Sequence, residues 1–385
     1  MKSTKKVVVI QRVLPHYRIS FFDALAEKLR DSDIELEVVY GNEKEGSVPK
    51  TAEGNWAWAK KIPNQYITLL GKELVWQSAV RKCSNADLVI VEQANRLILN
   101  HILLIKKNIV RKPRIAFLGH GKNFQSKEND FLSYLSEKLK QYLLSSVDWW
   151  FSYTELSTRH LIKLGIDKRN ITTFNNCVDT TEFKRCFDLP MTESDRRNFT
   201  HQAGIVGEQV GLFCGGMYQE KRLEFLLESC LLIKEKLPDF EMLFIGGGPD
   251  EDLLVEACKK YQWMKYLGPK FSEEKARYFE LSGALLMPGL VGLAIVDSFV
   301  SKTPIITTDI DYHSPEIEYI SSGNNGLMTG NTIQEYANAV IKFYRDENLR
   351  GQLARGCSES SEQITLDGMV DKFAAGVCAC LNEYR

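Results

Sequence analysis

A pair of glycines followed by a lysine stands in the segment Gly211–Arg222, GLFCGGMYQEKR, and could bind a phosphate. The apolar run stops at Gly215 and Gly216, and Lys221 comes shortly before a segment with helical spacing of its apolar residues, LEFLLESCLLIKEKL. A strand, a glycine turn and a helix in this order point backbone N–H groups and a helix N-terminus at an anion. An ordinary strand-to-helix turn with a solvated lysine is the alternative, and the pattern alone leaves it open.

Two common phosphate-binding motifs do not match this turn. The mononucleotide-binding loop needs a glycine directly before its lysine and a serine or threonine directly after it. Here Glu220 precedes Lys221, and Arg222 follows it. The dinucleotide fingerprint needs three spaced glycines, whereas Gly215 and Gly216 are adjacent and no third glycine completes the motif. A phosphate bound at this turn would therefore belong to another kind of ligand.

Three further strand ends carry residues that could do chemistry. FIGGGPDEDLL (Phe244–Leu254) has three glycines before a helix, and MPGLVGLAIVDSF (Met287–Phe299) has two glycines before a helix that carries Asp297. FLGHGKNF (Phe117–Phe124) places His120 between glycines. Glycines let a ligand approach the backbone, and a histidine there can donate a hydrogen bond. A tight turn, a helix-surface carboxylate and a structural histidine are the alternatives.

Composition excludes several classes of protein. The 385 residues are 44% apolar and 26% charged, as in a globular protein, and no apolar run reaches the about 20 residues of a membrane span. The N-terminus lacks the pattern of a signal peptide, so we expect a cytoplasmic protein. Nine cysteines occur without a C-x-x-C pair, which favours reduced thiols over a disulfide framework or a zinc site.

The net charge of −1 hides two halves of opposite sign. Residues 1–179 hold 28 Lys and Arg against 19 Asp and Glu, a net charge of +9, and the remainder has a net charge of −10. The basic half could face an anionic surface or substrate. We expect no nucleic-acid partner.

Short apolar strands alternate with helical segments in both halves, which predicts an α/β protein with two doubly wound parallel sheets. We expect a first domain over 1–179, a polar linker over 180–209 and a second domain over 210–364. A C-terminal helix over about 365–385 could pack back on the first domain. Ligands of such sheets sit at the carboxyl ends of strands, and the cleft between two such domains is the expected site.

In order and spacing, these segments resemble the family 4 glycosyltransferases of the GT-B fold over nearly the whole chain, most densely after Val210. FCGGMYQEKRLEFLL is similar to the family's strand, turn and helix with its lysine, and FIGGGPDEDLL to its G-x-G-P turn. MPGLVGLAIVDSFVSKTPIITT resembles the E-x7-E segment and the following strand, and NITTFNNCVDTTEF the entry to the linker. VIQRVLPHYRISFFDAL and LGHGKNFQ look like a branch that builds bacterial surface polysaccharides, including lipopolysaccharide.

The resemblance implies two Rossmann-like domains facing across a cleft and a set of site residues. His120 and Lys221 would be catalytic, and His16, Tyr17 and Arg18 would bind the acceptor. The donor-binding residues would be Gly215, Gly216, Lys221, Gly247, Gly289, Val291, Gly292, Leu293 and Asp297.

Two positions depart from the family pattern. The family arginine that helps to bind the pyrophosphate falls on Gly216, and the first glutamate of E-x7-E falls on Gly289. Lys221 is then the surest cation, because Arg222 would point elsewhere at a helix start. The role of that first glutamate cannot be transferred to this chain.

The implied activity is a retaining hexosyl transfer from a nucleotide sugar, without a metal or other cofactor. Negative charge grows on the nucleoside diphosphate as the glycosidic bond breaks, and a lysine, backbone N–H groups and helix N-termini stabilise it. Two alternatives stay open. One is different chemistry on the same fold, such as 2-epimerisation or phosphorolysis, and the other is an inactive sugar-nucleotide-binding subunit.

The expected acceptor is a glycan or a polyprenyl-diphosphate-linked glycan at the cytoplasmic face of the inner membrane. The segment Arg96–Arg114 holds an apolar helix followed by basic residues, and Trp56 and Trp58 stand in a loop that could face the acceptor. The basic residues are Lys106, Lys107, Arg111 and Lys112. Peripheral contact with an anionic membrane is one interpretation. A core helix with solvated terminal cations is the other.

Overall fold

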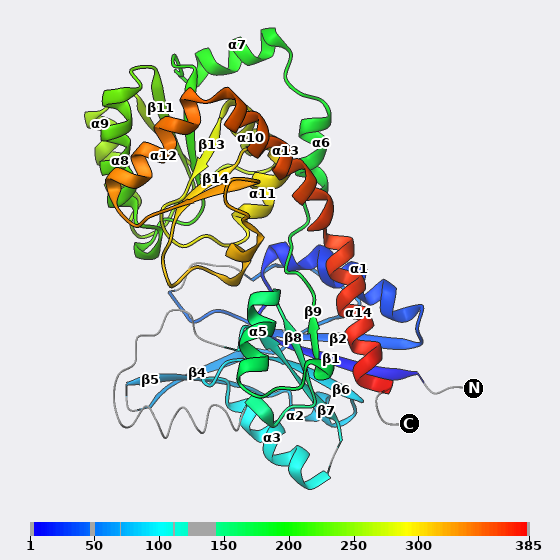
Figure 1. Cartoon of the computed structure of the whole chain (residues 1–385). Coiled ribbons are helices and arrows are strands. Elements are labelled where there is room, and N and C mark those ends of the chain that lie inside the picture. The colour runs from blue at the N-terminus through cyan, green and yellow to red at the C-terminus, as the bar shows by residue number, and fades with distance from the viewer. Residues whose placement is uncertain (1–3, 47–50, 70, 111, 122–143, 383–385) are drawn as a thin grey trace. The chain divides into compact units, whose positions relative to one another are not determined.

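A computed structural model of the chain describes residues 4–46, 51–69, 71–110, 112–121 and 144–382 (Figure 1). The chain divides into two compact units. Unit 1 comprises residues 1–179 together with 366–385, and unit 2 comprises residues 180–365. Each is described by itself below.

Unit 1 is built on a seven-stranded parallel sheet with the strand order β3-β2-β1-β6-β7-β8-β9. Val9 of the central strand pairs with Val38 on one side and with Ile90 on the other. The strands are β1 (Lys5–Val13), β2 (Ile34–Gly41), β3 (Ala59–Lys61), β6 (Leu88–Glu92), β7 (Arg114–Gly119), β8 (Trp149–Ser152) and β9 (Ile171–Thr173). Short apolar strands of this kind need helices over both faces to exclude water.

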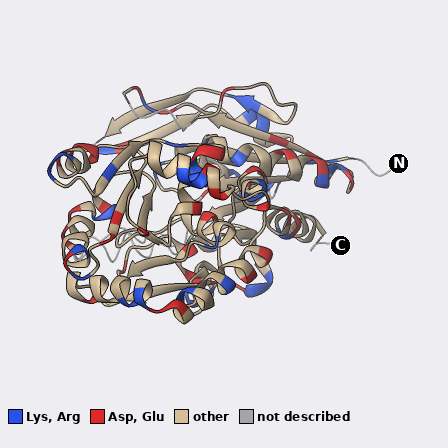
Figure 2. Cartoon of the chain, turned by 90° about the horizontal axis from the view of Figure 1, so that it is seen from above, with Lys and Arg blue, Asp and Glu red and all other residues tan. Residues whose placement is uncertain are grey.

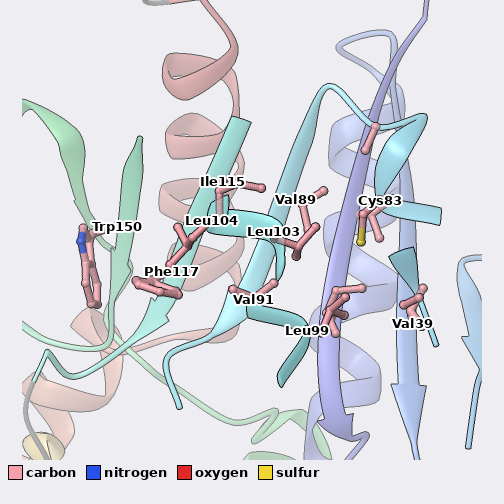
Figure 3. Packing of buried hydrophobic residues seen from close by; sticks show 14 of the residues in the cluster. Val39, Cys83, Val89, Val91, Leu99, Leu103, Leu104, Ile115, Phe117 and Trp150 are labelled. Atoms are coloured by element: carbon pink, nitrogen blue, oxygen red, sulfur yellow. The ribbon is translucent and has the colours of Figure 1, made fainter. Parts of the chain in front are cut away.

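Side-chain alternation sends successive strand residues to opposite faces of this sheet. Val8, Val89, Phe117 and Trp150 belong to one buried cluster with residues of three helices, and Figure 3 shows part of it. These helices are α2 (Val80–Ser84), α3 (Ile98–Val110) and α5 (Glu155–Lys163). Phe151, the residue after Trp150, instead stacks on Phe373, with ring centroids 4.2 Å apart.

The second face of this sheet carries α1 (Ile19–Arg30) and the C-terminal helix α14 (Leu366–Asn382). Phe373 of α14 contacts Phe21 of α1 edge-on at 5.3 Å between ring centroids, and it contacts Phe174 at 5.4 Å. Gly376 packs so closely that a Cβ there would lie 2.3 Å from the Thr172 hydroxyl. The last helix therefore belongs to the core of unit 1.

An antiparallel hairpin, β4 (Asn64–Leu69) and β5 (Lys72–Gln77), lies outside the main sheet and was not predicted. Its anchor is the Asn64 side chain, whose Nδ2 donates to the carbonyl oxygens of Arg12 at 2.7 Å and of Asn42 at 2.8 Å. Most side chains of its strands NQYITL and KELVWQ are exposed or half-buried, so burial does not alternate regularly along them.

Unit 2 has a six-stranded parallel sheet in the order β12-β11-β10-β13-β14-β15. Its strands are β10 (Gln209–Cys214), β11 (Phe240–Ile245), β12 (Met264–Gly268), β13 (Ala284–Leu286), β14 (Ile305–Thr308) and β15 (Gly326–Thr329). Its helices include α8 (Leu223–Lys236), α9 (Glu251–Lys260), α10 (Ser272–Leu281), α11 (Ala294–Ser301), α12 (Ile333–Arg345) and α13 (Glu347–Gln363). The strand order reverses between β10 and β13, which is the position where such sheets usually bind a ligand.

The segment 180–209 is not the linker that its polar composition predicted. It forms α6 (Thr181–Asp188) and α7 (Glu193–Gln202) within unit 2. Phe183 is buried and packs edge-on against Phe279, with ring centroids 5.3 Å apart. The Glu241 carboxylate then binds the backbone N–H groups of Val206 and Gly207, each at 2.8 Å. These few anchors fix a polar segment that the hydrophobic pattern could not identify as part of the domain.

Charged residues of both signs are interspersed along the helices (Figure 2). Among the helices that the structure describes, none is both long and apolar enough to cross a membrane.

Candidate functional site

Lys221 ends the turn between β10 and α8, and its side chain is buried, with 6% of the residue exposed. Its Nζ donates to the carbonyl oxygen of Leu290 at 2.5 Å and lies 5.5 Å from the centroid of the Tyr218 ring. In the part of the chain that the structure describes, no carboxylate pairs with this ammonium. Two of its three N–H donors are therefore available to a ligand.

Burial lowers the pKa of Lys221 from its ordinary value to about 8. The cause is the loss of hydration of the charged form, and the charges of Cys214 and Glu220 oppose it only in part. An anionic ligand beside Nζ would favour the ammonium and raise this pKa again. A bound anion could therefore act as the counter-ion of Lys221.

Gly289 lies against the backbone of the Lys221 turn. A Cβ at this position would be 2.3 Å from the carbonyl oxygen of Glu220 and 2.5 Å from that of Lys221. The N–H of Leu290 donates to the same Glu220 oxygen at 2.8 Å. Because no side chain fits at position 289, the glycine that replaces the family glutamate is a steric requirement of this loop.

The loop after β13 is fixed by residues at the end of β14. The Thr308 hydroxyl donates to Pro288 O at 2.6 Å, and the N–H of Val291 donates to Nδ1 of His313 at 3.1 Å. The other ring nitrogen of His313, Nε2, lies 2.8 Å from the carbonyl oxygen of Thr308, so it carries the proton. Burial lowers the pKa of His313, which favours this neutral form.

Arg222 braces the same loop and does not point into the Lys221 site. Its backbone is left-handed, with φ of 56°, and its Nη1 donates to Pro288 O at 3.3 Å and to Thr308 Oγ1 at 3.0 Å. The guanidinium also lies 4.1 Å from the centroid of the Phe225 ring. The Arg222 side chain thus points away from Lys221, as expected for a residue at a helix start.

The turn after β11 packs on the turn after β10, backbone against backbone. A Cβ at Gly246 would lie 1.9 Å from Gly215 O, and one at Gly248 would lie 2.3 Å from Met217 O. The N–H of Met217 donates to Gly247 O at 2.9 Å. The structure thus places Gly215 and Gly247, two predicted donor contacts, on adjoining turns.

Asp297 lies in the first turn of α11 and forms an ion pair with Lys275 of α10, at 2.9 Å between Oδ2 and Nζ. Both side chains are about one-fifth exposed, at 19% and 21%. Burial raises the pKa of the Cys214 thiol, at the end of β10, to about 12, and the charges of Lys275, Asp297 and Lys221 all act on it. These charged groups therefore surround the end of β10.

The remaining predicted donor residues occupy the same two loops. Val291 is buried, Gly292 and Leu293 are half-buried just before α11, and Gly216 is exposed on the turn after β10. A Cβ at Gly216 would lie 2.9 Å from the Tyr218 ring. All the predicted donor residues are thus in unit 2, where Asp297 lies on α11 and the others lie on the segments that follow β10, β11 and β13.

His120 follows β7 in unit 1, and its ring lies against Tyr153, with centroids 4.3 Å apart. Burial, together with the nearby charge of Arg18, lowers the pKa of His120 to about 4. The imidazole is therefore neutral near pH 7. The neighbouring Gly121, with φ of 73°, donates its N–H to the Gln93 side chain at 2.9 Å.

The three predicted acceptor residues form the short 3-10 turn η1 (His16–Arg18) before α1. His16 and Tyr17 are exposed, whereas Arg18 is buried. Nη2 of Arg18 donates to Asn176 Oδ1 at 2.6 Å. The structure brings Arg18 and His120 together around Tyr153, while His16 and Tyr17 face solvent.

Sequence reasoning missed several residues of these sites. His313, Lys275 and Asn176 each contact a predicted residue from more than 20 positions away in the chain. A histidine two residues after the second aspartate of TTDIDYHSP gave only a weak signal for His313. Nothing in the local sequence marks Lys275 or Asn176.

The cations predicted at the end of α3 are partly engaged within the protein. Lys107 pairs with Asp148 at 2.8 Å, and Lys106 donates to the Ser84 hydroxyl at 2.8 Å. Lys112 is exposed, and Arg111 lies outside the described residues. The same end of the helix exposes Ile105, Ile109 and Val110.

Within the ranges described, no group of three or more His, Cys, Asp and Glu residues could hold a metal ion.

A comparison with protein-family models finds a match within unit 2. Residues 208–346 match the family model described as "Glycosyl transferases group 1". This range contains all the predicted donor residues, from Gly215 to Asp297.

Two curated relatives are similar at low identity. The GtfA subunit of the UDP-N-acetylglucosamine–peptide N-acetylglucosaminyltransferase of Streptococcus parasanguinis is 20% identical over 242 residues, which are 60% of this chain and 46% of the relative. The alpha-monoglucosyldiacylglycerol synthase of Acholeplasma laidlawii is 22% identical over 161 residues, 40% of this chain and 39% of the relative. The matched part spans less than half the length of either relative.

The fold extends the similarity to both units. Anabaena HepE in complex with UDP superposes with a TM-score of 0.69 at 15% identity, over 97% of this chain and 99% of that one. The two parallel sheets are those of the GT-B architecture. The chain therefore has the GT-B fold, and its residues 208–346 match the glycosyl transferases group 1 family model.

Proposed function

We propose that the chain transfers a sugar from a nucleotide-sugar donor to a glycan or lipid-linked glycan acceptor in cell-surface polysaccharide synthesis. Unit 2 binds the donor, and the strand ends of unit 1 bind the acceptor. The observation that carries the proposal is Lys221. It is a buried ammonium without a carboxylate partner in the described structure, at the point where the strand order of the group 1 domain reverses.

The Lys221 site suits a diphosphate leaving group. Departure of a nucleoside diphosphate from the anomeric carbon builds negative charge on its phosphate oxygens. Lys221 can donate two hydrogen bonds to them, and backbone N–H groups at the glycine turn can add more. These donors are already in place, so they stabilise the developing charge with little reorganisation.

Retention of configuration and independence from metal are parts of the same proposal. The family resemblance supports front-face transfer through an oxocarbenium-like state, and the donor loops offer lysine and backbone donors for the phosphates. His120, neutral and beside Tyr153, would hydrogen-bond a sugar hydroxyl or position the acceptor.

Turnover with product analysis tests the function. Incubation with a panel of UDP, GDP, ADP and dTDP sugars, with and without EDTA, should give a glycosylated acceptor whose new linkage has the donor's anomeric configuration by NMR. UDP sugars come first, since HepE is seen with UDP. An epimerised sugar nucleotide without transfer would overturn the proposal, as would nucleotide binding without any turnover.

Lys221→Ala should lower transfer by about 10²–10³-fold, as expected when one donor to a developing oxyanion is lost. In the unmodified enzyme, donor kcat/KM should also fall above about pH 8, because the lysine of the free enzyme then loses its proton. Lys221→Arg keeps its charge at high pH and should lose this alkaline limb. Full activity of the alanine variant, or the same limb in the arginine variant, would contradict the proposed role.

Asp297, held by Lys275, should bind the donor ribose hydroxyls through its carboxylate. Asp297→Ala should raise donor KM more than it lowers kcat. Lys275→Gln should act in the same direction, and the double variant should cost less than the sum of the two, because the residues form one unit. Arg277→Gln on the same helix, which loses an exposed pair with Glu273, is the matched control. Additive effects of the two substitutions on donor KM would show that Lys275 does not act through Asp297.

A peripheral membrane contact is proposed for the end of α3. Ile105, Ile109 and Val110 are 63%, 77% and 57% exposed there, beside the exposed Lys112. Apolar side chains next to cations suit the boundary of an anionic bilayer. The reaction would then take place at the cytoplasmic face of the membrane.

Co-sedimentation with vesicles containing anionic lipid tests this contact. The protein should bind at low salt and less at high salt. Serine at positions 105, 109 and 110 should weaken binding, as should glutamine at positions 106, 107, 111 and 112. Ile162→Ser, which changes an exposed isoleucine of α5, should not. The absence of binding at low salt, or equal binding by every variant, would exclude this surface and leave the transfer reaction untouched.

A further inference from the structure

Arg18 is a buried cation at the strand-end edge of unit 1. Only 9% of the residue is exposed, and it stands at the N-terminus of α1. Its Nη2 donates to Asn176 Oδ1 at 2.6 Å, and its Nη1 lies 3.8 Å from the Met369 sulfur. The guanidinium also lies 5.8 Å from the Phe21 ring centroid and 6.0 Å from that of Tyr153.

No carboxylate within the described ranges pairs with this guanidinium. Arginine stays protonated in proteins, and it is rarely buried without an anionic partner because desolvation of the charge is costly. Asn176 and the Met369 sulfur engage two of its five N–H donors. The other donors are available to a ligand.

The surrounding charges leave this edge of unit 1 positive. The charge of Arg18 lowers the pKa of Glu92, which lies at the end of β6. The charges of Arg12 and Arg96 lower it as well. Burial raises the pKa of the Glu92 carboxyl, so its negative charge is disfavoured. Even when Glu92 is ionised, three arginines act on this carboxylate, and one of them, Arg96, also pairs with Glu73 at 3.6 Å.

The start of α1 adds to this positive potential. Arg18 occupies the N-cap position, no side chain caps the helix, and its first turn holds no acidic residue. The first backbone N–H groups of a helix carry partial positive charge, although the N–H of Ile19 already donates to His16 O in the turn that leads into α1. A second source of positive potential thus coincides with the buried guanidinium.

We propose that Arg18 and the N-terminus of α1 form an anion-binding site for a phosphoryl or carboxylate group. Tyr153 and Asn176 hold the guanidinium in place, and Nε and the free edge of the guanidinium donate to the anion. That this anion belongs to the acceptor rests on the proposed function. The site itself does not depend on it, because binding can be measured without turnover.

The competing explanation is a structural one, in which Arg18 fastens α14 and the Asn176 loop to α1. Both explanations predict a less stable protein when Arg18 is replaced. They differ in whether anion affinity changes as well, so the test measures binding and stability together.

Inorganic phosphate and glucuronate are the probes, titrated calorimetrically into the full chain carrying Lys221→Ala, which removes the cation of the donor site. This background should bind at least one of the two. Adding Arg18→Gln should weaken that binding about tenfold or more, as expected for loss of hydrogen bonds between charged groups. Preference for phosphate would indicate a phosphorylated or lipid-diphosphate acceptor, and preference for glucuronate an acidic sugar.

Arg30→Gln on the same helix is the matched control, because it removes the same charge from an exposed position. This variant should change the anion affinity by less than about twofold, because an exposed charge contributes little. If Arg18→Gln does not fold, Arg18→Lys takes its place and should still weaken binding, since lysine lacks the planar fork. No anion binding in the Lys221→Ala background, or unchanged affinity in the Arg18 variants, would overturn the proposal.

Discussion

The Lys221 site in unit 2 depends on the contact between the backbone of Glu220–Lys221 and Gly289. It brings the loops after β10 and β13 together at the point where the strand order reverses. Leu290 is drawn into the same contact from both sides, through its N–H to Glu220 and its carbonyl oxygen to Lys221. This backbone contact buries and orients Lys221, and the burial lowers the pKa of the lysine. The same contact requires a residue without a side chain at position 289.

Both units use a buried cation that lacks a carboxylate partner in the described structure, Lys221 in unit 2 and Arg18 in unit 1. The two respond differently to burial. Because a lysine can lose its proton, burial lowers the pKa of Lys221. Arginine cannot, so Arg18 relies on Asn176, aromatic rings and the start of α1. Under the proposed function, an anionic ligand completes each arrangement.

The sequence predicted the parts of this structure that depend on local periodicity. The segment LEFLLESCLLIKEKL, whose spacing predicts a helix, forms α8 over Leu223–Lys236. The hairpin of β4 and β5 was missed because its anchors are polar contacts to Arg12 and Asn42, which are distant in sequence. The partner of Asp297 was missed for the same reason. Lys275 belongs to another helix, α10, and it meets Asp297 only because α10 packs against α11.

Loss of the family arginine and first glutamate changes how the proposed donor site must work. A glutamate at position 289 would collide with Glu220 O, so its absence permits the tight contact that buries Lys221. Burial strengthens electrostatic interactions, because less water screens the ammonium from a phosphate. A single desolvated lysine can thus stabilise a leaving group more than an exposed one could. At the other end of the site, Lys275 keeps Asp297 paired. The two departures are therefore compatible with an active enzyme, since the same backbone contact that excludes the glutamate makes the remaining cation more effective.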